Sequence, residues 1–488
     1  MTVFDEGRVH ALLLSVKGYI ETNDMWQATE TMMLLVKGVP SNLWGSCLRE
    51  LLSVWEIFLL TSEQRTWLHD VFERALIVTL SEALKGIVPS DVLIKLLQLE
   101  ETSSKVEHRD VRKEFSGLLG QLARMSMGLY SQHNALQEAG YFGRHAERLG
   151  ASFSIQENVM MAHIWRILGD TKRSYDCIWA AMGGEKGVSR VLVVDTVYTL
   201  MLYMLLFSDW RDACFILGRS ISDDPVNRLM SKNIAGIYRQ SFLSSIDPYS
   251  DVLRRFSRHV RENQIPCYGH DHIDEPVSRW FIGENFSVLE DGIGNYSPQN
   301  WHRILEDGSR FEVFGFDKRI KTIYLTGKLP IPEQLKDKVI IVNTEELWNK
   351  KTPQDQNDIL DVFAFPLEKI VGLLQQKKDQ IFLTQPLYEE RNFTAAQQVE
   401  FYKRLLSNYD PARIMIKVHP RDVVDYEKIF SGYCVVKDKF PVEFLKLVGL
   451  ENQIDKLISV NTSCLYGFYD ESKIDLYDKE WRKLISQS

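Results

Sequence analysis

The stretch with the clearest chemical potential places a histidine and an arginine directly after a run of branched apolar residues. Residues 414–416 (Ile-Met-Ile) are typical of a buried strand, and Pro420 cannot donate to a sheet ladder, so the strand is expected to end before it. His419 and Arg421 then stand at the carboxyl end of a strand, where open α/β sheets bind their ligands. An imidazole beside a guanidinium suits the binding and protonation of a phosphate group.

A second polar strand end carries two adjacent carboxylates, Glu290 and Asp291, followed by Gly292. Neighbouring residues on a strand point to opposite faces, so at most one of these acids faces a given side of the sheet. That acid can act as a general base towards a hydroxyl group, although an acidic turn closed by glycine explains the same residues. Gly292 and Gly294 lack the third glycine of the GxGxxG pattern, which argues against a dinucleotide site.

More polar side chains stand where predicted elements of the last third begin or end, namely Thr384, Gln385, Glu443, Thr462 and Ser463. Thr384 and Gln385 follow a strand and can hydrogen-bond a ligand. The hydroxyls of Thr462 and Ser463 at a helix amino terminus suit a phosphate, and Glu443 can accept bonds from ribose hydroxyls. Structural explanations stay open for each: a solvated loop, an N-cap, or a first-turn acid favoured by the helix dipole.

The metal-ligating residue types do not predict a metal site. His270 and His272 lie in a polar loop with no third ligand beside them, so we interpret them as loop residues that line the acceptor side. Asp355 and Asp358 resemble a divalent-cation loop only superficially. The six cysteines form no CxxC pair and are interpreted as reduced thiols of a cytoplasmic protein.

Length and composition indicate an ordinary globular protein with several domains. The chain has 488 residues, of which 45% are hydrophobic and 25% charged, and its formal net charge is −8. A basic surface is the mark of general nucleic-acid binding, so nucleic acid is not an expected partner. The first ten residues contain acids and no apolar core, which is unlike a signal peptide. The apolar run at 191–207 contains Asp195 and is interpreted as a buried strand that leads into a buried helix.

The pattern of elements changes near a glycine-rich segment at 183–187. Residues 1–185 predict helices joined by short polar turns, a helical-hairpin domain of tetratricopeptide-like type. After it, short apolar strands alternate with helices, which indicates parallel sheets and crossover connections. We predict two Rossmann-like lobes, at 188–330 and 331–488. The expected strands are 190–196, 214–217, 280–282, 287–289, 323–325, 339–342, 381–383, 414–416, 435–436 and 457–460.

These motifs together resemble the bacterial sialyltransferases of glycosyltransferase family 52, of the lipooligosaccharide type, and the related bacterial polysialyltransferases. The similar segments are 193–206, 290–292, 383–387, 419–422, 440–443 and 462–463. The resemblance covers about residues 188 to 470, and the helical region before it lies outside. It implies a GT-B fold and an inverting transfer of sialic acid, or a related nonulosonic acid, from a CMP-activated donor. The leaving group carries one phosphate, so the resemblance implies no metal or other cofactor.

The resemblance also implies roles for the residues above. Asp291 is expected to be the general base on the acceptor hydroxyl, with Glu290 as the second choice, and His419 is expected to stabilise or protonate the departing phosphate. Glu443 is expected to contact the ribose. The remaining donor-binding residues are expected to be Gly292, Thr384, Gln385, Pro420, Arg421, Thr462 and Ser463.

Three alternatives and several partners stay open at the level of sequence. The donor can be CMP-Kdo, CMP-pseudaminic acid or a UDP-sugar instead, or the chain can be a helical-repeat scaffold that binds a nucleotide without turnover. The acceptor is expected to be a glycan, a lipid-linked glycan or a protein. The amino-terminal helices are candidates for a protein partner or for a homodimer. A lipid-linked acceptor would bring the protein to the inner face of the membrane.

Overall fold

The computed structural model describes most of the chain, with gaps. The described residues are 6–22, 24–38, 93–98, 109–184, 187–239, 251–272, 276–297, 301–304, 310–389, 393–460 and 471–477. They form two compact units, Met1–Cys177 and Ile178–Ser488, which are considered one at a time.

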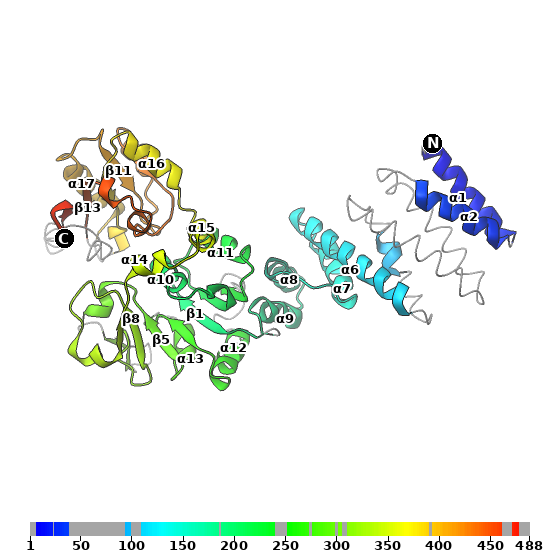
Figure 1. Ribbon diagram of the computed structural model, residues 1–488, viewed down its shortest axis with the longest axis horizontal. Coiled ribbons are helices and arrows are strands. Elements are labelled where there is room, and N and C mark those ends of the chain that lie inside the picture. Colours follow the sequence, from blue (N-terminus) through cyan, green and yellow to red (C-terminus); the bar gives the residue numbers. More distant parts are fainter. Residues whose placement is uncertain are drawn as a thin grey trace. The chain divides into compact units, whose positions relative to one another are not determined.

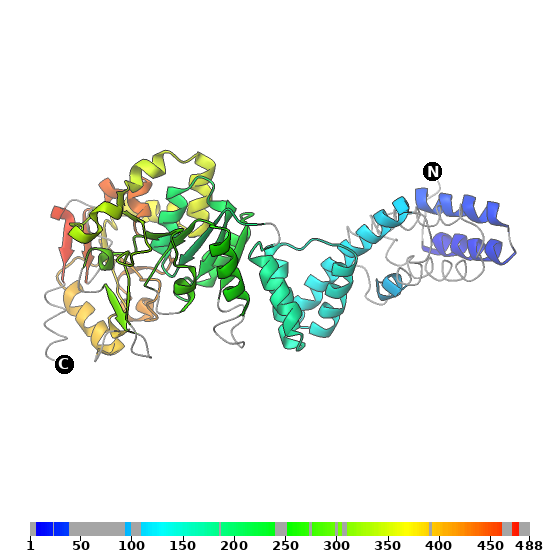
Figure 2. The same ribbon diagram turned by 90° about the horizontal axis from the view of Figure 1, so that it is seen from below.

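The first unit is built from helices. Its described helices are α1 (Glu6–Glu21), α2 (Met25–Gly38), α6 (Arg109–Gln132), α7 (Leu136–Arg148), α8 (Ile155–Ile167) and the start of α9 (Thr171–Ala181). Helices α1 and α2 run side by side as a hairpin (Figure 2). The helix α8 begins at a capping box between Ser154 and Glu157, and Gly169, at φ +82°, turns the chain into α9. The predicted amino-terminal helical region is therefore confirmed.

The second unit begins with a parallel sheet of seven strands in the order β3-β2-β1-β4-β5-β8-β9. The strands are β1 (Arg190–Val194), β2 (Ala213–Leu217), β3 (Gly236–Arg239), β4 (Cys267–Gly269), β5 (Phe286–Leu289), β8 (Thr322–Leu325) and β9 (Val339–Ile341). Helix α10 (Val197–Leu206) lies on one face, and α12 (Asp251–Glu262) and α13 (Pro276–Phe281) lie on the other (Figure 1). The strand order reverses between β1 and β4, which makes their carboxyl ends the expected ligand site.

A second parallel sheet has five strands in the order β12-β11-β10-β13-β14. The strands are β10 (Gln380–Leu383), β11 (Ile414–Lys417), β12 (Cys434–Val436), β13 (Lys456–Ser459) and β14 (Ile474–Leu476). Helices α17 (Ala395–Leu406) and α18 (Tyr426–Ile429) bury Tyr402 and Tyr426 against the strands. Here the order reverses between β10 and β13, next to β11. Around this sheet lie α16 (Leu367–Gln375) and α19 (Phe444–Leu447).

Two helices connect the sheets, α14 (Thr344–Asn349) and α15 (Pro353–Val362). Helix α15 carries Asp355 and Asp358 towards the first sheet, where Arg211 pairs with both and Lys232 pairs with Asp358. These two aspartates are thus neutralised by basic side chains, which explains their spacing without a cation. A short antiparallel pair, β6 (His302–Ile304) and β7 (Arg310–Glu312), follows β5 in the chain.

The predicted α/β fold with two parallel sheets is confirmed, and it is consistent with the GT-B type. The strand expected at 280–282 is wrong, because Trp280 and Phe281 end the helix α13 and Phe281 packs against Phe256 of α12. Three bulky apolar residues in a row fit either a strand or a buried helix turn. The strand β9 pairs with β8 although it lies after residue 330, so the first sheet extends past the predicted lobe boundary.

Candidate active site

Asp291 is the second residue after β5, and the backbone beyond it turns sharply. Gly292 has φ 153° and ψ −147°, a region that essentially only glycine adopts. The Oδ1 atom of Asn295 accepts hydrogen bonds from the N–H groups of Asp291 (2.8 Å) and Gly292 (3.3 Å). This closed turn fixes the start of the Asp291 side chain at the carboxyl edge of the sheet.

The carboxylate of Asp291 has three partners, which follow two other strands of the first sheet. Its Oδ1 accepts a hydrogen bond from the Thr196 hydroxyl (2.8 Å), which follows β1, and lies 3.3 Å from His270 Nε2, which follows β4. Its Oδ2 lies 3.0 Å from His272 Nε2. Burial opposes the charged form, but His270, His272 and the Thr196 hydroxyl outweigh it and hold the pKa of Asp291 well below its usual range.

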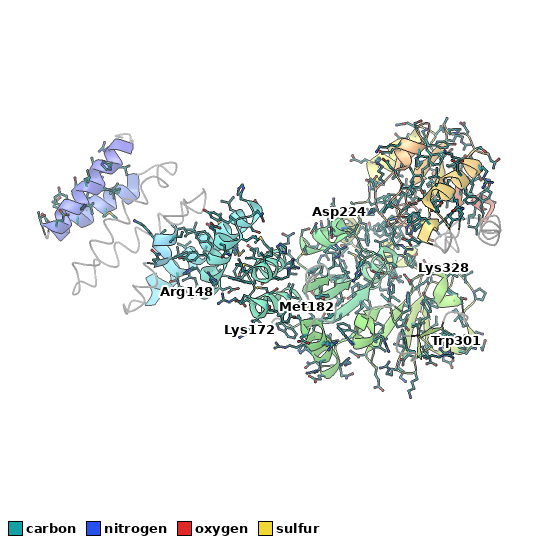
Figure 3. The ribbon with its side chains drawn as sticks, turned by 180° about the vertical axis from the view of Figure 1, so that it is seen from behind. Arg148, Lys172, Met182, Asp224, Trp301 and Lys328 are labelled. Atoms are coloured by element: carbon teal, nitrogen blue, oxygen red, sulfur yellow. The ribbon has the colours of Figure 1, made fainter. Side chains whose placement is uncertain are left out.

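Glu290, the neighbouring acid, is fully buried and has a separate set of partners. Its carboxylate pairs with Lys328 Nζ at 2.6 Å and accepts hydrogen bonds from Tyr296 (2.8 Å), Tyr198 (3.2 Å) and the Thr326 hydroxyl (2.8 Å). Lys328 is itself only 4% exposed and follows β8 (Figure 3). The two adjacent acids therefore differ: Glu290 is enclosed in a network, whereas the side chain of Asp291 keeps 21% of its surface exposed.

His419 lies two residues after β11, and its loop is tied to the end of β10. The His419 N–H donates to the hydroxyl of the buried Thr384 (2.9 Å), and the Arg421 N–H donates to His419 Nδ1 (3.2 Å). Because Nδ1 accepts, the proton of the neutral ring is on Nε2. Burial and the charges of Arg421 and Lys417 lower the pKa of His419 to about 3, so the ring is neutral near pH 7.

The segment after His419 is anchored by a buried acid. Asp422 accepts hydrogen bonds from the Tyr426 hydroxyl (2.7 Å) and from the Gln398 side-chain amide (3.2 Å). The Arg421 guanidinium pairs with Glu389 at 2.9 Å on the surface. These contacts hold the loop in one conformation, so His419 does not have to be ordered by a ligand.

Glu443 connects the two sheets electrostatically. It is 4% exposed and precedes α19. Burial, with a smaller contribution from Glu290, raises the pKa of Glu443 to about 7 against the opposing effects of Lys328 and Lys417. Lys328 follows a strand of the first sheet and Lys417 ends a strand of the second, so Glu443 senses charges from both carboxyl edges.

The structure describes some of the remaining predicted site residues and not others. Thr462 and Ser463 lie outside the described residues. The backbone of Gln385 is bound by the Tyr402 hydroxyl, which accepts from its N–H (2.9 Å) and donates to its carbonyl (2.8 Å). Pro420 is half-buried in the His419 loop.

Sequence reasoning gave too little weight to His270 and His272. It assigned them to a loop without a third partner, yet both lie beside Asp291, which comes from the next strand of the sheet. The signal that could have found them is the strand order, because His270 follows β4 at the switch point of the sheet. Lys328 was missed for the same reason, as it is an isolated lysine whose counter-charge comes from another strand.

The side chains of His270, His272 and Asp291 lie close enough to suggest a metal site, with their ligand atoms within 4.8 Å of one another. The hydrogen bonds argue against one. His270 Nδ1 faces the Asp195 N–H at 3.4 Å and accepts from it, so its proton is on Nε2, which lies 2.7 Å from the Thr199 hydroxyl. A metal binds histidine through a ring nitrogen with a free lone pair, and in this arrangement neither nitrogen of His270 offers one.

Among the described residues, no helix is both long and apolar enough to cross a lipid bilayer. The expected membrane-like run at 191–207 is divided between β1 and α10, as the sequence predicted.

Comparisons with known proteins identify the family of the chain. The family model of glycosyltransferase family 52 matches residues 277–475, a range that contains Asp291, His419 and Glu443. An uncharacterized protein of Haemophilus influenzae is 31% identical over 223 residues, which are 45% of this chain and 70% of that protein. The chain belongs to glycosyltransferase family 52 and is therefore a glycosyltransferase.

Proposed function

We propose that the chain transfers sialic acid, or a related nonulosonic acid, from a CMP-activated donor to a hydroxyl group of an acceptor, with inversion at the anomeric carbon. Family 52 includes sialyltransferases, which supports the donor class. The observation that carries the proposal is that a partly exposed carboxylate follows a strand of one sheet and an imidazole follows a strand of the other. Glu443, which interacts with Lys328 and Lys417, connects the two edges.

Asp291 is the base in this proposal. It takes the proton of the acceptor hydroxyl as the hydroxyl oxygen bonds to the anomeric carbon of the donor. The exposure of its side chain and its closed turn support this choice over Glu290. Glu290 has no exposed surface and already accepts four different donors, so a substrate hydroxyl would have to displace one of them.

His419 acts on the leaving group. The electron pair of the breaking bond goes to a phosphate oxygen of CMP, and the Nε2–H of His419 donates a hydrogen bond to that oxygen. The neutral ring of the free protein serves as such a donor. A bound phosphate also favours the imidazolium, because its negative charge opposes the effect of Arg421 and Lys417 on the pKa.

The other donor contacts follow from the positions of the predicted residues. Glu443 accepts from the ribose hydroxyls. Gln385 and the loop of Pro420 and Arg421 bind the cytidine or the phosphate, and the hydroxyls of Thr462 and Ser463 complete the phosphate site. Thr384 acts through His419, whose backbone N–H it binds. Gly292 supplies the turn that presents Asp291.

The acceptor is a glycan, a lipid-linked glycan or a protein, and the amino-terminal helices are the candidate surface for its larger part or for a second copy of the chain. We assign the reaction to the cytoplasm, where CMP-activated donors are accessible to a reduced protein. Four described cysteines are free thiols, and three of them are buried, which suits a reducing compartment.

The experiment that tests this function is a donor screen. The full chain is incubated with CMP-sialic acid, CMP-Kdo, CMP-pseudaminic acid and UDP-sugars, with and without oligosaccharide acceptors, and release of the nucleotide is measured. We expect CMP release from a CMP-nonulosonate that increases when an acceptor is present. Turnover of a UDP-sugar alone would contradict the proposal. Binding of CMP without any turnover of a donor would support a nucleotide-binding scaffold instead.

A further inference from the structure

His272 lies between two carboxylates. Its Nε2 is 3.0 Å from Asp291 Oδ2, and its Nδ1 is 3.9 Å from Asp271 Oδ1. Nδ1 is buried, and no hydrogen-bond partner for it occurs among the described residues. The imidazole therefore has an acid on each side, one of which is the proposed base.

The far carboxylate is held in place by strained backbone. Asp271 is fully buried and accepts hydrogen bonds from the consecutive N–H groups of Phe314 (2.8 Å) and Gly315 (2.6 Å). Phe314 has φ +57°, an uncommon conformation for a bulky residue, and its ring stacks on His272 with a centroid distance of 4.3 Å. Strain of this kind persists where the surrounding structure enforces it, and it clusters at functional sites.

This geometry determines which ring nitrogens of His272 carry a proton. A nitrogen lone pair that faces a carboxylate is repelled by it, so both ring nitrogens of His272 are protonated and the ring is an imidazolium. Burial alone disfavours that charge, but the interactions with Asp271 and Asp291 outweigh it and raise the pKa of His272 to about 9.

Other charged groups near Asp271, His272 and Asp291 also affect the protonation of His272. His270 faces His272 at a ring distance of 5.0 Å, but burial and His272 lower the pKa of His270, so it carries no charge near neutral pH that would oppose the imidazolium of His272. Asp195, after β1, acts on His270, and Lys338 interacts with Asp271 from the segment before β9. The two direct carboxylate neighbours remain the decisive partners of His272.

An imidazolium that donates to Asp291 makes this carboxylate a weak base. We propose that His272 is a positioning residue of the base, and that the Asp271–His272–Asp291 unit must release one proton before Asp291 can take the proton of the acceptor hydroxyl. This inference rests on the proposed function for its kinetic consequence. The protonation state of His272 does not depend on that function.

The first test measures protonation directly in the full chain. Histidines are labelled with ¹⁵N, and the His272 signal is assigned by its loss in His272→Gln. We expect a doubly protonated ring at pH 7.5 that titrates near pH 9, and a titration that moves down by at least about one pH unit in Asp291→Asn. A singly protonated His272 at pH 7.5 would overturn the inference, even if no substrate were known.

The second test measures kcat/KM between pH 6.5 and 9 for the wild type, His272→Gln and the control His302→Gln, which changes an exposed histidine on β6. The wild type and the control should lose about tenfold per pH unit below pH 8.5, because the unit retains its proton. His272→Gln should be at least about tenfold slower at pH 9 and nearly independent of pH. If it kept the wild-type slope, His272 would have no such role; inactivity of the wild type with every donor would instead contradict the proposed function.

Discussion

At the scale of single residues, the site separates two adjacent acids into different tasks. Glu290 compensates the buried ammonium of Lys328, whereas Asp291 keeps exposed surface and contacts two histidines. Because side chains alternate along a strand, the two acids are expected to point to opposite faces of the sheet. The alternation does not predict which side chains each acid contacts. That outcome depends on Lys328, His270 and His272, which come from other strands.

A substitution of Glu290 tests this division. Glu290→Gln removes the direct ion-pair partner of the buried Lys328 ammonium, so we expect a loss of about 3 to 5 kcal/mol in the free energy of unfolding. The control Glu284→Gln changes an exposed acid just before β5 and should stay within about 0.5 kcal/mol. Denaturant unfolding measures both. A Glu290→Gln protein as stable as the control would mean that this ion pair is not formed.

At the scale of elements, the site is assembled at the ends of strands. Prolines, glycines and polar residues after apolar runs located the ends of β5, β10, β11 and β13 in the sequence. The short strands β3, β4 and β14 were not predicted, because each contains a glycine or a charged residue and none forms a run of branched apolar residues. Without β4, the switch point beside His270 could not be located, and the pairing of His272 with Asp291 could not be derived.

The start of α19 offers a prediction about pH. Glu443 has a pKa of about 7 in the folded protein, above the ordinary value of 4.5, so between these values the folded state holds more protons than the unfolded state. Stability must therefore fall as pH rises from about 4.5 to 7 and stay low above it. Glu443→Gln should remove this loss and gain about 3 kcal/mol at pH 8, but much less at pH 5.

Thermal unfolding at the two pH values measures this difference, with Glu368→Gln, an exposed acid on α16, as the control. The same Glu443→Gln protein should bind CMP more weakly, since it loses the charged acceptor for the ribose. An equal effect on stability at pH 5 and pH 8 would show that Glu443 is already ionised at pH 5.

At the scale of the whole molecule, the proposed reaction needs complementary groups from two parallel sheets. The change from helical hairpins to alternating strands and helices predicted this architecture, because hydrophobic periodicity reports it directly. The charges that connect the sheets were not predictable in the same way. Lys328, Lys417 and Glu443 are isolated in the sequence, and only the folded chain brings them within electrostatic reach.

The most direct test of the account is transfer by Asp291→Asn and His419→Ala, measured as CMP release with donor and acceptor present. Each variant removes a group from a different sheet. Each should lose about 100- to 10,000-fold in kcat while the protein stays folded, as shown by its circular dichroism at the assay temperature. If both folded variants kept near-full turnover, the two sheets would not share the reaction in this way, and the assignment of base and leaving-group residue would be wrong.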